Sequence, residues 1–309
     1  MSYYESDYIG SSLLAKFIDH QDKAALETKP TESMEDGKRF EDLVQQEITG
    51  ESIFDDKYFR SDLKSIPSTT KEGAKPILEI MESENFREEV DNGYILKADG
   101  TPHGTYKNHN RCLDQIKAHD YRRPIPETSW GKFFKMLENI KRTKFELMCK
   151  EFELSDLLQN VTVTQFQREH FWEDKSGAKC RMKTDMQSFY QVDEEMRGLI
   201  WDIKVTANWN TFLFNWRTKY IWQNKHYLSG FQNFCELKKV RPPEKMWYII
   251  VESTPPYLVT LWALHPIELE ELDSPYHAAL KKCQTWIDAG KPTTGFRKQQ
   301  TVNRYGREM

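Results

Sequence analysis

The sequence contains few cysteines and no long hydrophobic run. Its 309 residues include five cysteines, which are scattered and never paired as C-x-x-C. This pattern argues against a disulfide framework, an iron–sulfur cluster and a four-cysteine zinc site. No stretch approaches the roughly 18 apolar residues of a membrane span, and "MSYYESDYIGSS" lacks the features of a signal peptide. We therefore expect a cytoplasmic protein with reduced thiols and no membrane association.

Several common enzyme motifs are also missing. The chain has no G-x-S-x-G elbow, no G-x-x-x-x-G-K-[ST] loop and no G-x-G-x-x-G turn. Serine hydrolases, P-loop NTPases and dinucleotide-binding enzymes therefore lack support. His103, His109 and Cys112 have spacings that suggest zinc, but no fourth ligand is evident, which favours a polar loop.

Charge is nearly balanced overall but unevenly distributed. The formal net charge is −4, so the whole chain is not a polycation. Residues 31–60 carry nine acidic and four basic side chains, whereas residues 201–245 carry eight basic and three acidic ones. The basic segment could attract a polyanion. The alternative is a solvated helix face that acids elsewhere balance.

The first half of the chain is predicted to be mainly helical. Residues 1–50 contain a short helix starting at Ser11 or Ser12 and a longer one at 34–48. Turn-forming residues dominate from 52 to 128, which we interpret as an insertion with long loops and one helix at 76–88. A further helix is expected over 130–158, with an apolar stripe that includes Phe133, Met136, Leu137, Ile140 and Phe145.

The second half changes to the period of β-strands. Residues 161–188 predict a β-hairpin around a "KSG" turn. A polar link at 191–197 precedes a strand at 199–205, a long helix at 210–237, strands at 245–253 and 257–266, and a helix at 266–289. We expect an α/β fold in which a mixed central sheet is flanked by helices, forming one domain over 1–290 with its core in 130–290. The basic segment 291–309 has the composition of a disordered tail.

The stretch "LIWDIKVTAN" (199–208) places charge inside a predicted strand. Alternate strand residues share a face, so Asp202 and Lys204 point the same way, opposite to an apolar face formed by Leu199, Trp201, Ile203 and Val205. Such a strand is either the edge of a sheet with a surface salt bridge or part of a functional site.

A second acid favours a site. If the second strand of the hairpin lies beside 199–205, Asp185 can approach Asp202. Two carboxylates repel each other unless a divalent cation lies between them, and hard oxygen ligands suit Mg²⁺ or Mn²⁺. Lys204 would then stand at the edge of the metal, where an ammonium can stabilise a phosphoryl group and orient or deprotonate a water. These are the parts of a metal-dependent phosphodiesterase.

Asp185 followed by Asp202-Ile203-Lys204 resembles the signature of the PD-(D/E)xK nucleases. The segments "HFWEDKSGAKCRMKTDM", "LIWDIKVTANWNTF" and "YIWQNKHYLSGF" are similar, in this order, to the RecE-like exodeoxyribonuclease VIII branch, which includes phage-type exonucleases. "YYESDYIGSSLLAKFI" and "DGKRFEDLVQQEI" resemble its N-terminal elements. The resemblance covers about 1–50 and 160–265 and implies a restriction-endonuclease-like core.

The resemblance also implies roles for individual residues. Asp185 and Asp202 match the metal-binding acids, Lys204 matches the catalytic lysine, and the carbonyl of Ile203 would be a backbone metal ligand. Glu41 matches a first-helix position that carries glutamate or histidine. Gln223 and Tyr227 match a Q-x-x-x-Y motif for binding nucleic acid, and their spacing places them on one helical face. Near this motif, Arg217 and Lys219 are expected to contact DNA.

Some positions depart from the family pattern or have an ordinary structural alternative. Thr184 stands where the signature has proline, and Val205 stands where threonine is usual, but neither residue supplies a ligand. Glu41 stands where close relatives would have histidine, and it is alternatively a solvated helix residue. Gln223 and Tyr227 are alternatively part of a packed aromatic helix.

The implied activity is Mg²⁺-dependent exonuclease digestion of linear double-stranded DNA, with Mn²⁺ able to substitute. The family implies 5′→3′ polarity, 3′ overhangs for a single-strand annealing recombinase, and a ring-shaped trimer or tetramer. An endonuclease with the same core and a catalytically silent DNA-binding protein remain alternatives. Cleavage of linear but not closed circular duplex would distinguish the exonuclease from both.

Overall fold

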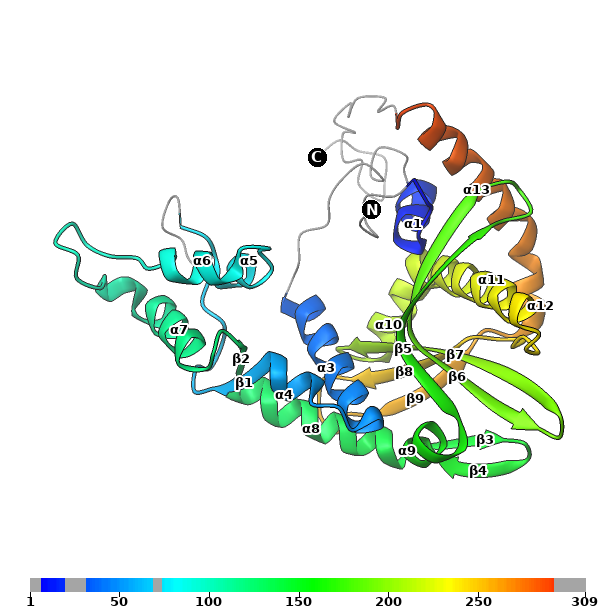
Figure 1. Cartoon of the computed structure of the whole chain (residues 1–309), viewed down its shortest axis with the longest axis horizontal. Helices are drawn as coiled ribbons and strands as arrows, with labels where there is room; N and C mark the ends of the chain where they lie inside the picture. Colours follow the sequence, from blue (N-terminus) through cyan, green and yellow to red (C-terminus); the bar gives the residue numbers. More distant parts are fainter. Residues whose placement is uncertain (1–6, 20–31, 69–73, 292–309) are drawn as a thin grey trace, which may run out of the picture.

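The computed structural model describes residues 7–19, 32–68 and 74–291 and is built around a five-stranded sheet. The strands are β5 (Val163–Glu173), β6 (Lys179–Val192), β7 (Glu195–Thr206), β8 (Trp247–Glu252) and β9 (Val259–Ala263), in the order β5-β6-β7-β8-β9. The β7–β8 pair is parallel and the other neighbours are antiparallel. The expected mixed central sheet flanked by helices is therefore present (Figure 1).

The predicted hairpin corresponds to β5 and β6, whose turn contains Gly177 at φ 80°, a conformation that favours glycine. The predicted polar link at 191–197 is wrong. β6 and β7 continue through most of it and form a second hairpin, because Val192 pairs with Glu195 across a tight turn. Polar side chains at the exposed tip of this ribbon resemble a loop in composition.

One face of the sheet is covered by the first and last helices of the chain. These are α1 (Ser11–Asp19), α10 (Trp209–Asn215), the π-helical turn η4 (Trp216–Tyr220), α11 (Ile221–Lys238), α12 (Pro266–Glu271) and α13 (Asp273–Asp288). Their apolar side chains form a core with Ile200, Tyr248 and Ile250 of the sheet. We call this the α11-side core.

The opposite face is covered by α3 (Glu32–Thr49) and α8 (Glu127–Arg142), which pack on Trp201, Ile203 and Ile249. We call this the α3-side core. The predicted helix over 130–158 is wrong beyond Arg142, since β3 (Lys144–Leu147) and β4 (Lys150–Glu153) form a hairpin, followed by α9 (Leu154–Asp156) and η3 (Leu157–Val161). Phe145 belongs to this hairpin, although its side chain still packs in the α3-side core.

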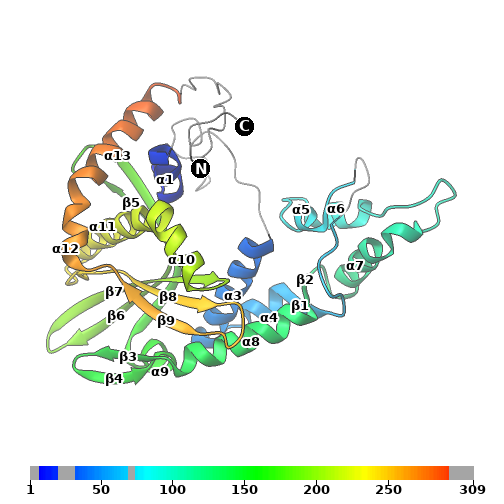
Figure 2. The same cartoon turned by 180° about the vertical axis from the view of Figure 1, so that it is seen from behind.

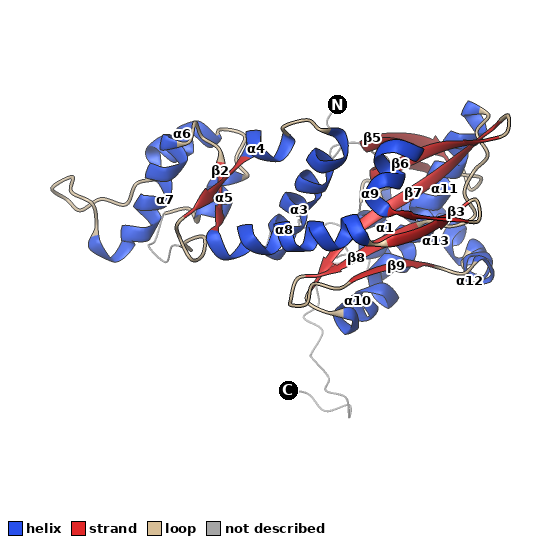
Figure 3. Ribbon diagram, turned by 90° about the horizontal axis from the view of Figure 1, so that it is seen from below, coloured by secondary structure: helices blue, strands red, loops and turns tan. Residues whose placement is uncertain are grey.

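The described residues within 53–126 form an arm that starts against α3 and α8 and extends away from the sheet (Figures 2 and 3). Its elements are α4 (Ile53–Lys57), β1 (Tyr58–Ser61), α5 (Ile77–Met81), α6 (Phe86–Asn92), η2 (Gly104–Tyr106), α7 (Lys107–Ala118) and β2 (Arg123–Pro126), with β1 and β2 parallel. The arm has its own apolar cluster, and it contains more helix than the single predicted one.

The polar loop predicted around His103 and Cys112 is partly wrong. His109 and Cys112 lie on α7 with their side chains buried, and the His109 Nε2 atom bonds to the Gly93 carbonyl at 3.0 Å. Cys112 packs in the cluster of the arm.

Within the described ranges, none of the helices combines the length and the apolar composition needed to cross a bilayer. The predicted tail at 291–309 lies outside the described residues beyond Lys291.

Close packing of α11 on the β5–β6 ribbon predicts a specific mutational effect. A methyl group at Gly230 would lie 2.7 Å from the Trp172 ring and 2.9 Å from the Met182 sulfur. We expect Gly230→Ala to lower the free energy of unfolding by about 1–3 kcal/mol in urea titration. Gly37→Ala on α3 meets no atom within 4 Å and should raise it by about 1 kcal/mol. Equal effects at the two positions would contradict this packing.

Candidate active site

The candidate site lies where β6 and β7 separate. Their pairing ends at Met186 and Trp201, and the next residues outward are Asp185 and Asp202. Beyond this point Ile9 pairs with Cys180 on β6. The Asp185 carboxylate reaches across the fork and accepts a hydrogen bond from the Ile203 backbone N–H at 3.2 Å. The two acids predicted to converge are thus brought to one fork in the sheet.

Asp202 is the most enclosed group of the site, with 0% of its surface exposed. Its Oδ1 atom accepts a hydrogen bond from the Gln223 side chain of α11 at 3.0 Å. Its Oδ2 atom forms an ion pair with the Lys204 ammonium and accepts no hydrogen bond from any other described donor. The Asp202–Lys204 pair is therefore buried beneath α11, and the predicted opposite strand face packs in the α3-side core.

The electrostatics follow from this burial. Burial raises the pKa of Asp202 to about 7; the positive charge of Lys204 opposes this rise, while the nearby Asp185 carboxylate adds to it. Burial lowers the pKa of Lys204, but attraction to Asp202 and Asp185 outweighs it and raises that pKa well above its usual value. Lys204 is thus held as a cation, with Nζ 5.4 Å from the centre of the Tyr220 ring.

Glu41 approaches from α3, and its half-buried side chain lines the same cleft as Asp185. Burial and then the negative charge of Asp185 raise the pKa of Glu41 well above its ordinary value, and Lys204 opposes the rise. Glu41 is thus electrostatically part of the site rather than an ordinary solvated helix residue.

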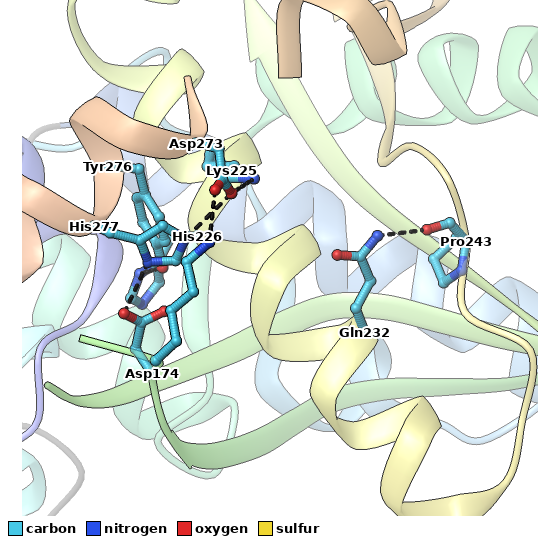
Figure 4. A network of polar contacts seen from close by, with 9 residues as sticks. Asp174, Lys225, His226, Gln232, Pro243, Asp273, Tyr276 and His277 are labelled. Atoms are coloured by element: carbon cyan, nitrogen blue, oxygen red, sulfur yellow. Dashed lines mark hydrogen bonds and ion pairs between the residues drawn. The ribbon is translucent and has the colours of Figure 1, made fainter. Parts of the chain in front are cut away.

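A polar network fixes α11, the helix that carries Gln223, to its neighbours (Figure 4). His226, which is completely buried, bonds through Nε2 to the Arg181 carbonyl at 2.9 Å and through Nδ1 to the Tyr276 hydroxyl at 3.0 Å. Since a carbonyl only accepts, Nε2 carries the proton and Nδ1 accepts from Tyr276. Lys225 pairs with Asp273 at 2.9 Å, which fixes α11 to α13 two residues from Gln223.

Asp185 and Glu41 line a cleft of about 860 Å³, whose other lining residues come from α1, α3, the arm, β5, β6 and α11, while Asp202 lies buried behind it. Its lining combines acidic Glu41, Asp42 and Asp185 with five basic side chains, namely Lys38, Lys57, Arg123, Arg181 and Lys183. Gln167, Tyr58 and Tyr227 also line it. A cleft of this size with cationic walls around carboxylates fits a polyanionic chain that is bound near a metal.

The residues at the fork fit a hard divalent cation. Asp202 Oδ2 is a buried oxygen with no donor besides Lys204, and the neighbouring Asp185 carboxylate interacts with Asp202 closely enough to raise its pKa. Mg²⁺ usually takes only one or two protein carboxylates. No three His, Cys, Asp or Glu side chains form a complete metal site in the part of the chain that the structure describes. The carboxylates of Asp185 and Asp202 have the chemistry that such a cation needs, and metal binding by these two acids, by Glu41 and by the Ile203 carbonyl stays a prediction.

The predicted DNA-binding residues differ in how they are placed. Gln223 contacts Asp202 directly, and Tyr227 lines the cleft one turn further along α11. The Lys219 ammonium lies 5.6 Å from the centre of the Tyr220 ring that Lys204 also approaches. The side chain of Arg217 lies outside what the structure describes.

Sequence reasoning missed most of the cleft wall. Lys183 and Arg181 lie two and four residues before Asp185 on the same strand, so their alternation was a usable signal. Lys38, Lys57 and Arg123 come from α3, α4 and β2 and have no shared sequence pattern.

Comparisons with known proteins do not identify the residues of the site. No family model matches the chain, and no curated protein is similar to it. Among solved structures, the chain is similar to the crystal structure of a "Putative exonuclease" from Eubacterium rectale, with a TM-score of 0.46 and 11% sequence identity. The match covers 99% of this chain and 92% of that one. Similarity at this level carries no information about the residues of the site.

If Asp185 and Asp202 bind a cation, Mg²⁺ should stabilise the folded protein. At pH 8 and a Mg²⁺ concentration 100 times Kd, the expected gain is about 2.7 kcal/mol, which is a rise of a few degrees in Tm. The pKa of Asp202 is raised to about 7, so protons compete with the cation below that pH. The Mg²⁺ concentration needed for a given shift in Tm should therefore be about fivefold higher at pH 6 than at pH 7 and nearly constant above pH 8.

Thermal denaturation with and without Mg²⁺ checks this expectation. Asp185→Asn should abolish the Mg²⁺-dependent shift, whereas Asp193→Asn, in the exposed β6–β7 turn, should retain it. A full Mg²⁺ shift in Asp185→Asn would contradict the assignment of this ligand.

Proposed function

We propose that the protein is a Mg²⁺-dependent deoxyribonuclease of the PD-(D/E)xK type, acting as an exonuclease on linear double-stranded DNA. The observation that carries the proposal is the arrangement at the strand fork, where Asp185, Asp202 and Lys204 gather beside a cleft with basic walls. Gln223, which the resemblance assigns to the nucleic-acid motif, donates to one of these acids, and this contact supports the motif assignment.

The residues divide the work of phosphodiester hydrolysis. Asp185 and Asp202 would hold the cation, which when bound polarises the scissile phosphate and lowers the pKa of water. Lys204, kept protonated by the two acids, places a fixed positive charge where negative charge develops on the phosphoryl oxygens. Gln223 fixes the orientation of the Asp202 carboxylate, and Tyr227 with the basic cleft wall binds the DNA strand.

The finer features of the proposal come from the resemblance to RecE-like exonucleases. They are 5′→3′ polarity, 3′ overhangs passed to a single-strand annealing recombinase, and a ring-shaped trimer or tetramer around DNA. Mn²⁺ should replace Mg²⁺, because both accept hard oxygen ligands. A cytoplasmic location belongs to the same proposal.

Incubation with linear and covalently closed duplex DNA, in Mg²⁺ or EDTA, tests the function. The proposal expects Mg²⁺-dependent loss of linear DNA and survival of closed circles. Nicking of the circles would support an endonuclease instead, and binding without cleavage of either DNA would support a catalytically silent protein.

Replacement of Lys204 should separate chemistry from binding. We expect Lys204→Ala to reduce kcat about 10²–10³-fold with little loss of DNA affinity, because it removes a charge that acts on the transition state. The control Lys135→Ala removes an exposed charge from α8, outside the cleft, and should leave cleavage unchanged. Undiminished cleavage by Lys204→Ala would remove this residue from the mechanism.

A further inference from the structure

Gln167 on β5 has a backbone conformation that is unusual for a strand. Its φ is 52°, in the left-handed region that side chains other than glycine rarely adopt. Nine described non-glycine residues have positive φ, and the other eight lie in turns or just after helices. Such a conformation costs of order 1–3 kcal/mol, and residues of this kind cluster at functional sites.

The kink lies directly opposite the first metal-binding acid. β5 and β6 are paired at Phe166–Met186 and at Arg168–Thr184, but the intervening Gln167–Asp185 position is not paired. The ladder is therefore interrupted at the one place where Asp185 leaves the sheet toward Ile203.

The interruption also changes which face the side chains occupy. Phe166 on β5 and Met186 on β6 pack in the α3-side core. Trp172 lies an even number of residues from Phe166, and Met182 an even number from Met186, yet both belong to the α11-side core. Alternation along an undistorted strand would keep residues of one parity on one face. The alternation of side chains between the two faces is therefore reversed at the Gln167–Asp185 position. As a result, Gln167 faces the cleft together with Asp185.

The Gln167 side chain is exposed in this cleft, and no described group hydrogen-bonds to it. A carboxamide is neutral and offers two N–H donors and one acceptor. The cleft that it lines carries five basic side chains against three acidic ones, and this excess of positive charge suits the phosphates of a DNA backbone more than the edges of bases.

We infer that Gln167 is a substrate-binding residue. Its side chain donates a hydrogen bond to a backbone phosphate of the DNA, and this phosphate is the neighbour of the phosphate that is cleaved. The inference rests on the proposed nuclease function. The left-handed kink is the device that presents this side chain beside Asp185, and it also frees Asp185 from the ladder.

Two substitutions separate the side chain from the kink. Glycine and asparagine both tolerate positive φ, so Gln167→Gly and Gln167→Asn keep the backbone while removing or shortening the carboxamide. We expect Gln167→Gly to raise the Kd for duplex DNA and the KM for cleavage about tenfold, with kcat changed less than about twofold. Gln167→Asn should fall between it and the native protein. Asp193→Gly, also at positive φ but in the β6–β7 turn, is the matched control and should have no effect.

The dependence of Kd on salt identifies the kind of contact. Loss of a neutral donor weakens binding without changing the number of released counterions, so the slope of log Kd against log salt should stay the same in Gln167→Gly. Lys183→Gln, which removes a cleft charge, should reduce that slope by about 1. Kd is measured in Ca²⁺ on duplexes that differ only in base sequence.

The outcomes are distinguishable from failure of the nuclease proposal. If the native protein binds but does not cleave, the function fails, while the Kd series still tests the role of Gln167. Unchanged Kd and KM in Gln167→Gly, or a loss that depends on the base sequence, would overturn the inference.

Discussion

The structure of the site depends on the burial of the Asp202 carboxylate. A buried carboxylate is costly unless it is paired, and here Lys204 and Gln223 are the two groups that compensate it. Each of these two groups requires a particular arrangement. Lys204 must lie on the same face of β7 as Asp202, and α11 must hold Gln223 above the sheet. The polar network of His226, Tyr276, Lys225 and Asp273 fixes that helix. The pairing leaves a carboxylate of fixed orientation beside Asp185.

The sheet is regular away from the site and irregular at it. β6 separates from β7 just beyond Met186, and β5 is kinked at Gln167 on the other side of the same strand. Asp185 is therefore released from regular pairing on both edges, which lets its carboxylate turn to the Ile203 N–H and to the cleft. Deviations from local rules concentrated at one position are expected where function, rather than folding stability, selects the geometry.

The sequence was informative where a periodic pattern reflects a packed face. Alternation at 199–205 predicted that Asp202 and Lys204 share a face, and helical spacing predicted α3 and α11. It failed where tertiary contacts decide the structure. The apolar stripe over 130–158 continued through the β3–β4 hairpin because Phe145 packs in the same core from a strand. Nothing local in the sequence showed that β6 and β7 separate at Asp185, or that Lys57 and Arg123 of the arm reach the cleft.

The account therefore depends on two carboxylates sharing one cation. Anomalous scattering from crystals soaked in Mn²⁺ tests this most directly. The account predicts a peak bonded to carboxylate oxygens of both Asp185 and Asp202, with the Lys204 ammonium nearby but not bound. A well-occupied Mn²⁺ bound elsewhere, with neither acid among its ligands, would contradict it.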